Sequence, residues 1–114
     1  MRRSPPLAPG APYYDITIHI VLNDFGKLGR AYVETDEAEA DEQTIIDNLL
    51  RGQYSRPVRV VAFNTGELSS RDVSEDIARA VAERARNEHR KLSKGTRRFL
   101  EEYLEEAEIP AEVP

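Results

Sequence analysis

The nine residues YDITIHIVL, Tyr14 to Leu22, form the most regular apolar alternation in the chain. The even positions of this run are all large and apolar, whereas the odd positions are mixed. Because successive side chains of a strand point to opposite faces of a sheet, the run predicts a central β-strand. We expect its even face to pack against helices and its odd face to stay open.

A β-hairpin is expected directly after this strand. The segment NDFGKLG, 23–29, contains an Asn-Asp pair and two glycines, which supply the positive-φ positions that a reversing loop needs. The next residues, RAYVE at 30–34, alternate again and predict an antiparallel second strand. Asp24 fits a turn-forming carboxylate better than a catalytic acid.

A helix and a third strand follow the hairpin. The segment 43–52 has apolar residues at helical spacing and ends in glycine, so it predicts a short amphipathic helix. The acidic run 35–42 before it lacks the ligand spacing of a calcium-binding loop and indicates a solvated helix start. The valine-rich segment 58–64 predicts a third strand, which a right-handed crossover places parallel to the second.

Two further helices are expected in the second half of the chain. Ser69 and Asp72 have the spacing of a capping box and predict the start of the second helix. A third helix follows the break at 93–95 and carries an apolar stripe at 99–104. The loop before the second helix has an alternative interpretation, in which free helix amides bind an anion. The candidate residues for that anion site are Asn64, Thr65, Gly66, Ser69 and Ser70.

These elements predict a two-layer α+β domain with the order ββαβαα. Its sheet is expected to be three-stranded and mixed, in the order 2-1-3, with helices packed on one face and a C-terminal helix. The proline-rich residues 1–12 predict a disordered N-terminal arm, because they bury too little apolar surface to offset the entropy of ordering. Residues 13–109 are expected to form the single domain, and residues 110–114 a flexible C-terminal tail.

The odd face of the predicted sheet is too apolar for a free surface, so we treat it as a candidate interaction face. Its members are Thr17, His19, Val21, Tyr32, Arg59, Val61 and Phe63. Three explanations stay open at this stage. The third helix covers the face, a second copy pairs with it in a two-fold dimer, or its aromatic residues stack single-stranded bases.

The segment 84–98 is strongly basic, and the helix that follows it has an acidic outer face. The first interpretation is a solvated surface whose charges complement one another. The alternative is phosphate binding by Arg84, Arg86, Arg90, Lys91, Arg97 and Arg98.

Composition limits the classes of function. The 114-residue chain has no cysteine, which excludes disulfides and thiolate chemistry, and its net charge of -5 disfavours a general polyanion binder. No apolar run approaches the ~20 residues of a membrane span, so we expect a cytoplasmic protein without membrane contact. His19 and His89 have no evident nucleophile beside them. We assign no catalytic residue, cofactor or metal ligand, and an enzyme is the less favoured class.

Three stretches, at 23–41, 52–67 and 71–81, resemble a group of small uncharacterised bacterial proteins of unknown function. The likeness covers about half of the chain and implies a bacterial accessory protein, with no role for any residue. We therefore expect a non-enzymatic protein-interaction or regulatory module that binds a protein partner or forms a homodimer. The alternative is a nucleic-acid-binding accessory protein that uses segment 84–98 or the open sheet face.

Overall fold

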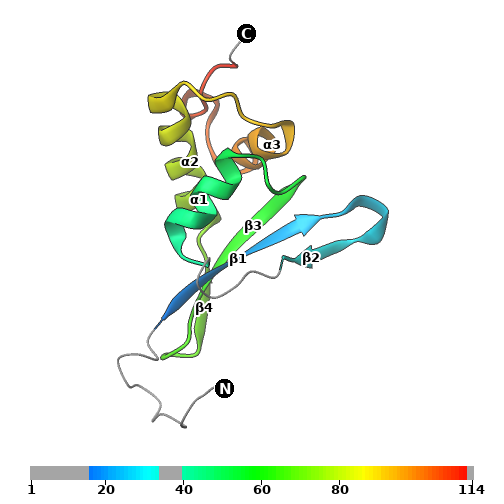
Figure 1. Ribbon diagram of the computed structural model, residues 1–114, viewed down its shortest axis with the longest axis vertical. Helices are drawn as coiled ribbons and strands as arrows, with labels where there is room; N and C mark the ends of the chain where they lie inside the picture. Colours follow the sequence, from blue (N-terminus) through cyan, green and yellow to red (C-terminus); the bar gives the residue numbers. More distant parts are fainter. Residues whose placement is uncertain (1–15, 34–39, 113–114) are drawn as a thin grey trace.

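The structure is a computed structural model that describes residues 16–33 and 40–112. Within these ranges the chain forms a four-stranded antiparallel sheet in the order β2-β1-β3-β4, with its helices gathered on one side (Figure 1). The strands are β1 (Thr17–Asp24), β2 (Arg30–Tyr32), β3 (Pro57–Asn64) and β4 (Ser69–Asp72). The helices are α1 (Glu42–Leu50), α2 (Ser74–Glu88) and α3 (Lys94–Tyr103), with 3-10 turns η2 (Gly26–Leu28) and η4 (Glu106–Glu108).

The α+β class is confirmed, and the central place of β1 between β2 and β3 is as expected. The prediction of three strands in a mixed sheet was wrong, because a fourth strand pairs with β3 and every neighbouring pair is antiparallel. This strand has the sequence SSRD, which carries no apolar alternation. β4 forms because the hairpin that joins it to β3 brings the two segments side by side. The local sequence pattern does not show this constraint.

The start of α2 also differs from the prediction. Ser69 and Asp72 do not form a capping box, because Ser69 lies in β4 and the helix begins only at Ser74. Asp72 instead accepts a hydrogen bond from the amide of Ser74 at 2.8 Å through Oδ1. The four residues Ser69–Asp72 are therefore an edge strand rather than a helix cap.

The two faces of β1 are the reverse of the prediction. His19 and Val21 are buried on the helix side, opposite Ala62 and Val60 of β3. Ile18 and Ile20, which were expected against the helices, are half-buried on the other side. Small side chains suit the helix side because they let the helices approach the sheet closely.

The helices supply most of the core. The predicted apolar stripes of α1 and α3 are confirmed, since Ile45, Leu49, Phe99 and Leu100 are almost fully buried. These residues belong to one cluster together with Val60 of the sheet. Because α3 joins this cluster, it lies on the helix side and does not cover the opposite face of the sheet.

The β1–β2 hairpin agrees with its prediction. Gly26 and Gly29 have φ angles of 70° and 88°, a region that glycine enters without strain. Asp24 Oδ1 accepts a hydrogen bond from the amide of Gly26 at 2.8 Å, which confirms its role as a turn carboxylate. The predicted arm 1–12, most of the acidic run 35–42 and the end of the predicted tail lie outside the described residues.

The helices in the described part of the chain are too short or too polar to cross a lipid bilayer.

Candidate functional site

The first candidate surface is the uncovered side of the sheet, which we name the open face. Its members come from three strands and are Ile18, Ile20, Leu22, Tyr32, Val61 and Phe63. The register places Ile18 beside Phe63 and Ile20 beside Val61, so the apolar side chains form two adjacent rows. Among the described residues, none of these side chains contributes to the buried core cluster.

Four residues of the predicted interaction face do lie on this side of the sheet. They are Tyr32 of β2 and Arg59, Val61 and Phe63 of β3. The register places Arg59 opposite Leu22.

The other three residues of that prediction were placed on the wrong side. Thr17, His19 and Val21 alternate with the open face and point toward the helix side. The ring Nδ1 of His19 lies 3.3 Å from the carbonyl oxygen of Ala40, and its backbone amide donates to the same oxygen. His19 is therefore a buried packing residue whose ring lies within hydrogen-bonding distance of the Ala40 carbonyl.

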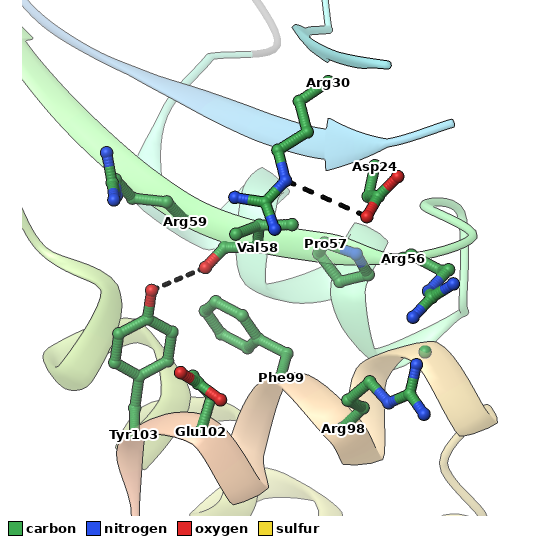
Figure 2. A pocket seen from close by; sticks show the side chains of 11 residues that line it. Asp24, Arg30, Arg56, Pro57, Val58, Arg59, Arg98, Phe99, Glu102 and Tyr103 are labelled. Carbon is green, nitrogen blue, oxygen red and sulfur yellow. Dashed lines mark hydrogen bonds and ion pairs between the residues drawn. The ribbon is translucent and has the colours of Figure 1, made fainter. Parts of the chain in front are cut away.

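The second candidate surface is a groove between α3 and the strand ends, which we name the arginine groove (Figure 2). It has a volume of about 280 Å³. Pro57, Val58, Phe99 and Tyr103 supply its apolar lining, and the Tyr103 hydroxyl donates a hydrogen bond to the carbonyl of Val58. Its charged rim consists of Arg30, Arg56, Arg59, Arg98, Asp24 and Glu102.

Close backbone contact between α3 and the start of β3 forms one wall of this groove. A Cβ atom on Gly95 would lie 1.9 Å from the carbonyl oxygen of Ser55, so only glycine permits this approach. Ser93 caps the helix by accepting a hydrogen bond from the amide of Thr96. The buried Thr96 hydroxyl then donates to the Leu49 carbonyl and fixes the first turn of α3 against α1.

The arginines of the groove differ in how they are paired. Arg30 Nε lies 3.8 Å from Asp24 Oδ2, and Arg59 Nε lies 3.3 Å from Asp72 Oδ2, so both arginines are ion-paired. A hydrogen bond to Tyr103, together with the charge of Asp72, raises the pKa of the Arg59 guanidinium above its ordinary value.

Arg56 and Arg98 form no side-chain hydrogen bond or ion pair with any other residue that the structure describes. Sequence reasoning missed Arg56, because nothing local to Arg56-Pro57 indicates that it lines the same groove as Arg98, 42 positions later.

Most of the basic segment 84–98 is engaged within the molecule. Arg84 pairs with Asp47 and Glu88, and Arg90 also pairs with Glu88. Arg86 and Arg97 donate to backbone carbonyls of the C-terminal segment, those of Glu108 and Pro110. These contacts agree with a surface whose charges complement one another. Of the predicted phosphate-contacting set, Lys91 and Arg98 have no partner among the described residues.

The predicted anion loop has a different structural context. Asn64, Thr65, Gly66, Ser69 and Ser70 lie in the β3–β4 hairpin, away from the first turn of α2. Asn64 Oδ1 accepts from the amide of Glu67, and the Thr65 hydroxyl bonds the backbone of Ile16. The premise of free helix amides at this loop was therefore wrong.

No group of three or more His, Asp or Glu side chains within residues 16–33 and 40–112 is arranged to hold a metal ion. No family model, curated protein or solved structure matches the chain.

Proposed function

We propose that the protein is a non-enzymatic protein-interaction module of a bacterial accessory type, which self-associates by packing its open face against that of a second copy. The observation that carries this proposal is the pair of apolar rows, Ile18 and Ile20 beside Phe63 and Val61, which no described element covers. An exposed apolar patch of several hundred Å² on a protein surface is often an interaction site. The proposal keeps the expected cytoplasmic location.

The dimensions of the open face favour a dimer that dissociates on dilution. Two strands of eight residues flanked by two short strands cover roughly 26 by 19 Å, given a rise of about 3.3 Å per residue and a strand spacing of about 4.8 Å. This projection is smaller than the about 800 Å² per partner of a standard interface. Side-chain relief adds area, so the predicted dimer is of modest stability. Its two-fold symmetry makes the apolar rows self-complementary.

The edges of the sheet favour association through the face. The edge strand β2 has only three residues, and the edge strand β4 has four. Arg30, Arg71 and Asp72 place charges along these edges, which is how natural sheets avoid pairing strand to strand.

Light scattering of the purified protein across a dilution series tests the proposal. We expect a dimer mass at high concentration that falls toward the monomer mass on dilution. A Val61→Glu variant should be a folded monomer at every concentration. The matched control is Leu28→Glu, which adds the same charge at a side chain that is 90% exposed in the hairpin loop, outside the open face. A monomer at all concentrations for the unmodified protein, or equal loss of the dimer in the control, contradicts the proposal.

A nucleic-acid accessory role is the second candidate. It is favoured by the position of Arg59 beside Leu22 on the open face, next to the exposed Tyr32 and on the strand that carries Phe63. Such an arrangement offers rings for base stacking and a cation for phosphate. Anisotropy of a labelled single strand at low salt should rise and then fall steeply with ionic strength. No change with a single strand or a duplex removes this candidate.

A further inference from the structure

Two arginines of the arginine groove have no anionic partner among the described residues. Figure 2 shows the guanidinium groups of Arg56 and Arg98 directed toward one another across one end of the groove. Neither group has an ion pair or hydrogen bond within the described chain. Two like charges held close together repel one another, and the repulsion is relieved when an anion binds between them.

The same two arginines also line an adjoining hollow at the first turn of α3. This hollow, about 430 Å³ in volume, is bordered by Lys94 and Arg97 and by one acid, Glu101. Together the two hollows bring six basic side chains and three acidic ones to one end of a chain whose net charge is -5. The basic members are Arg30, Arg56, Arg59, Lys94, Arg97 and Arg98. The concentration of positive charge is therefore local.

We propose that Arg56 and Arg98, assisted by Lys94, bind the phosphate group of a phosphate ester at the mouth of the arginine groove. Three cations that line one hollow match the charge of close to two that a phosphate monoester carries near neutral pH better than the single charge of a carboxylate. Guanidinium forks bind phosphate oxygens in pairs, which gives geometric selectivity as well as charge. The first turn of α3 adds the positive end of its dipole to the same hollow.

The rest of the groove suits the organic part of such an ester. Val58, Phe99 and Tyr103 line it with apolar surface, and its volume is near the lower end of small-molecule sites. The Tyr103 hydroxyl is occupied by the Val58 carbonyl, so this side chain offers the organic part its ring surface, beside the charged side chains of the rim. A phosphate ester with a flat or apolar body therefore fits better than inorganic phosphate alone.

The proposal is independent of self-association, and it is tested by nuclear magnetic resonance titration of the full chain at low ionic strength. The first probe is inorganic phosphate, and the second is a nucleoside monophosphate. We expect shift changes concentrated at Arg56, Lys94, Gly95 and Arg98, with the monophosphate binding more tightly than inorganic phosphate. Acetate at the same ionic strength should cause no comparable change.

Matched variants show whether the named arginines carry the binding. Arg56→Gln and Arg98→Gln should each raise the Kd at least about tenfold, because each removes a charge-assisted hydrogen bond. Both side chains are exposed and lack described partners, so the variants should keep the melting temperature. Arg71→Gln, at another exposed arginine on β4, should leave the Kd unchanged.

Two further probes separate the sources of the anion. A single-stranded oligonucleotide that binds more tightly than the monophosphate, and loses binding in both groove variants, supports the site and names a nucleic-acid phosphate as its ligand. A glutamate-rich peptide that binds more tightly than either phosphate probe overturns the proposal in favour of an acidic protein surface. Shift changes spread evenly over all arginines, or an equal effect of Arg71→Gln, also overturn it.

Discussion

The two sides of the sheet are built from the same strands but differ in how deeply their side chains are buried. The helix side carries small or polar residues such as His19, Val21, Val60 and Ala62, all of them buried. The open face carries the larger side chains of the same strands, and the structure leaves them only half-buried. The more apolar side of β1 is therefore the side without helices.

The larger side chains of a strand therefore need not be the ones that face the helices. α1 and α2 bring large residues, among them Ile45, Leu49 and Ile77, and these need small partners on the sheet to approach closely. The polar residues on that side have partners. Asn23, for example, accepts from the Arg56 amide and donates to the hydroxyl of Ser55. Under the proposed self-association, a second copy covers the open face.

The largest expected effect comes from adjacent valines on opposite sides of β3. Val60→Glu should prevent folding, since Val60 is 0% exposed and an unpaired charge there costs more than about 4 kcal/mol. Val61→Glu should change the free energy of unfolding of the monomer by about 1 kcal/mol or less. Circular dichroism with urea denaturation checks both values. Equal destabilisation by the two substitutions contradicts the difference in burial between the two sides of the sheet.

The next effect concerns the position of α3 on the helix side. Gly95→Ala should destabilise the protein by about 1 to 3 kcal/mol, because the added Cβ meets the backbone of Ser55. The same substitution in an exposed helix stabilises it by up to about 1 kcal/mol, so the sign of the change is diagnostic. Thermal melting measures it. A rise in the melting temperature means that α3 does not contact β3 as described.

A smaller effect is expected where α2 joins β3. The Ser74 hydroxyl accepts a hydrogen bond from the buried amide of Val60 at 2.8 Å. Ser74→Ala should cost about 1 to 3 kcal/mol, because it leaves that amide without its acceptor. Ser70→Ala, beside Phe63 at the edge of the open face, should change stability by no more than about 0.5 kcal/mol. Chemical denaturation measures the free energy of unfolding of both variants. The two variants carry the same Ser→Ala change on opposite sides of the sheet.

The smallest expected effect is a pH dependence at the start of α1. The hydroxyl and amide of Thr44 lower the pKa of the Asp41 carboxyl below its ordinary value of 3.8. A lowered folded-state pKa means that its stabilisation is present above pH 3.8 and is lost as the pH falls through the folded-state pKa. Asp41→Asn keeps a good cap but does not titrate, so its melting temperature should differ most from the parent at neutral pH. A difference that grows on acidification contradicts this assignment.

The sequence predicted those parts of the fold that rest on local periodicity. The stripes of α1 and α3, the β1–β2 turn with Asp24, and the central place of β1 all follow from spacing and turn chemistry. β4 could not be predicted, because SSRD acquires its strand geometry from pairing with β3.

The candidate surfaces were predictable only in part. The more apolar side of β1 is the side without helices, so the pattern of β1 alone pointed to the wrong face. The face that meets the helices depends on the size of the helix residues that come later in the chain. The arginine groove joins β1, β2, β3 and α3, and its pair of Arg56 and Arg98 exists only once α3 has packed against the start of β3. Neither the choice of face nor this packing of α3 can be read from a local stretch of sequence.

The most direct test of the central claim measures how accessible the methyl groups on the two sides of the sheet are to solvent. A soluble paramagnetic agent broadens the signals of methyl groups that it can approach. At low protein concentration we predict strong broadening for Ile18, Ile20 and Val61 and none for Val21 and Val60. At high concentration the first set should become protected as the dimer forms. Open-face methyl groups that are protected even at low concentration, or exposed at both, contradict the account.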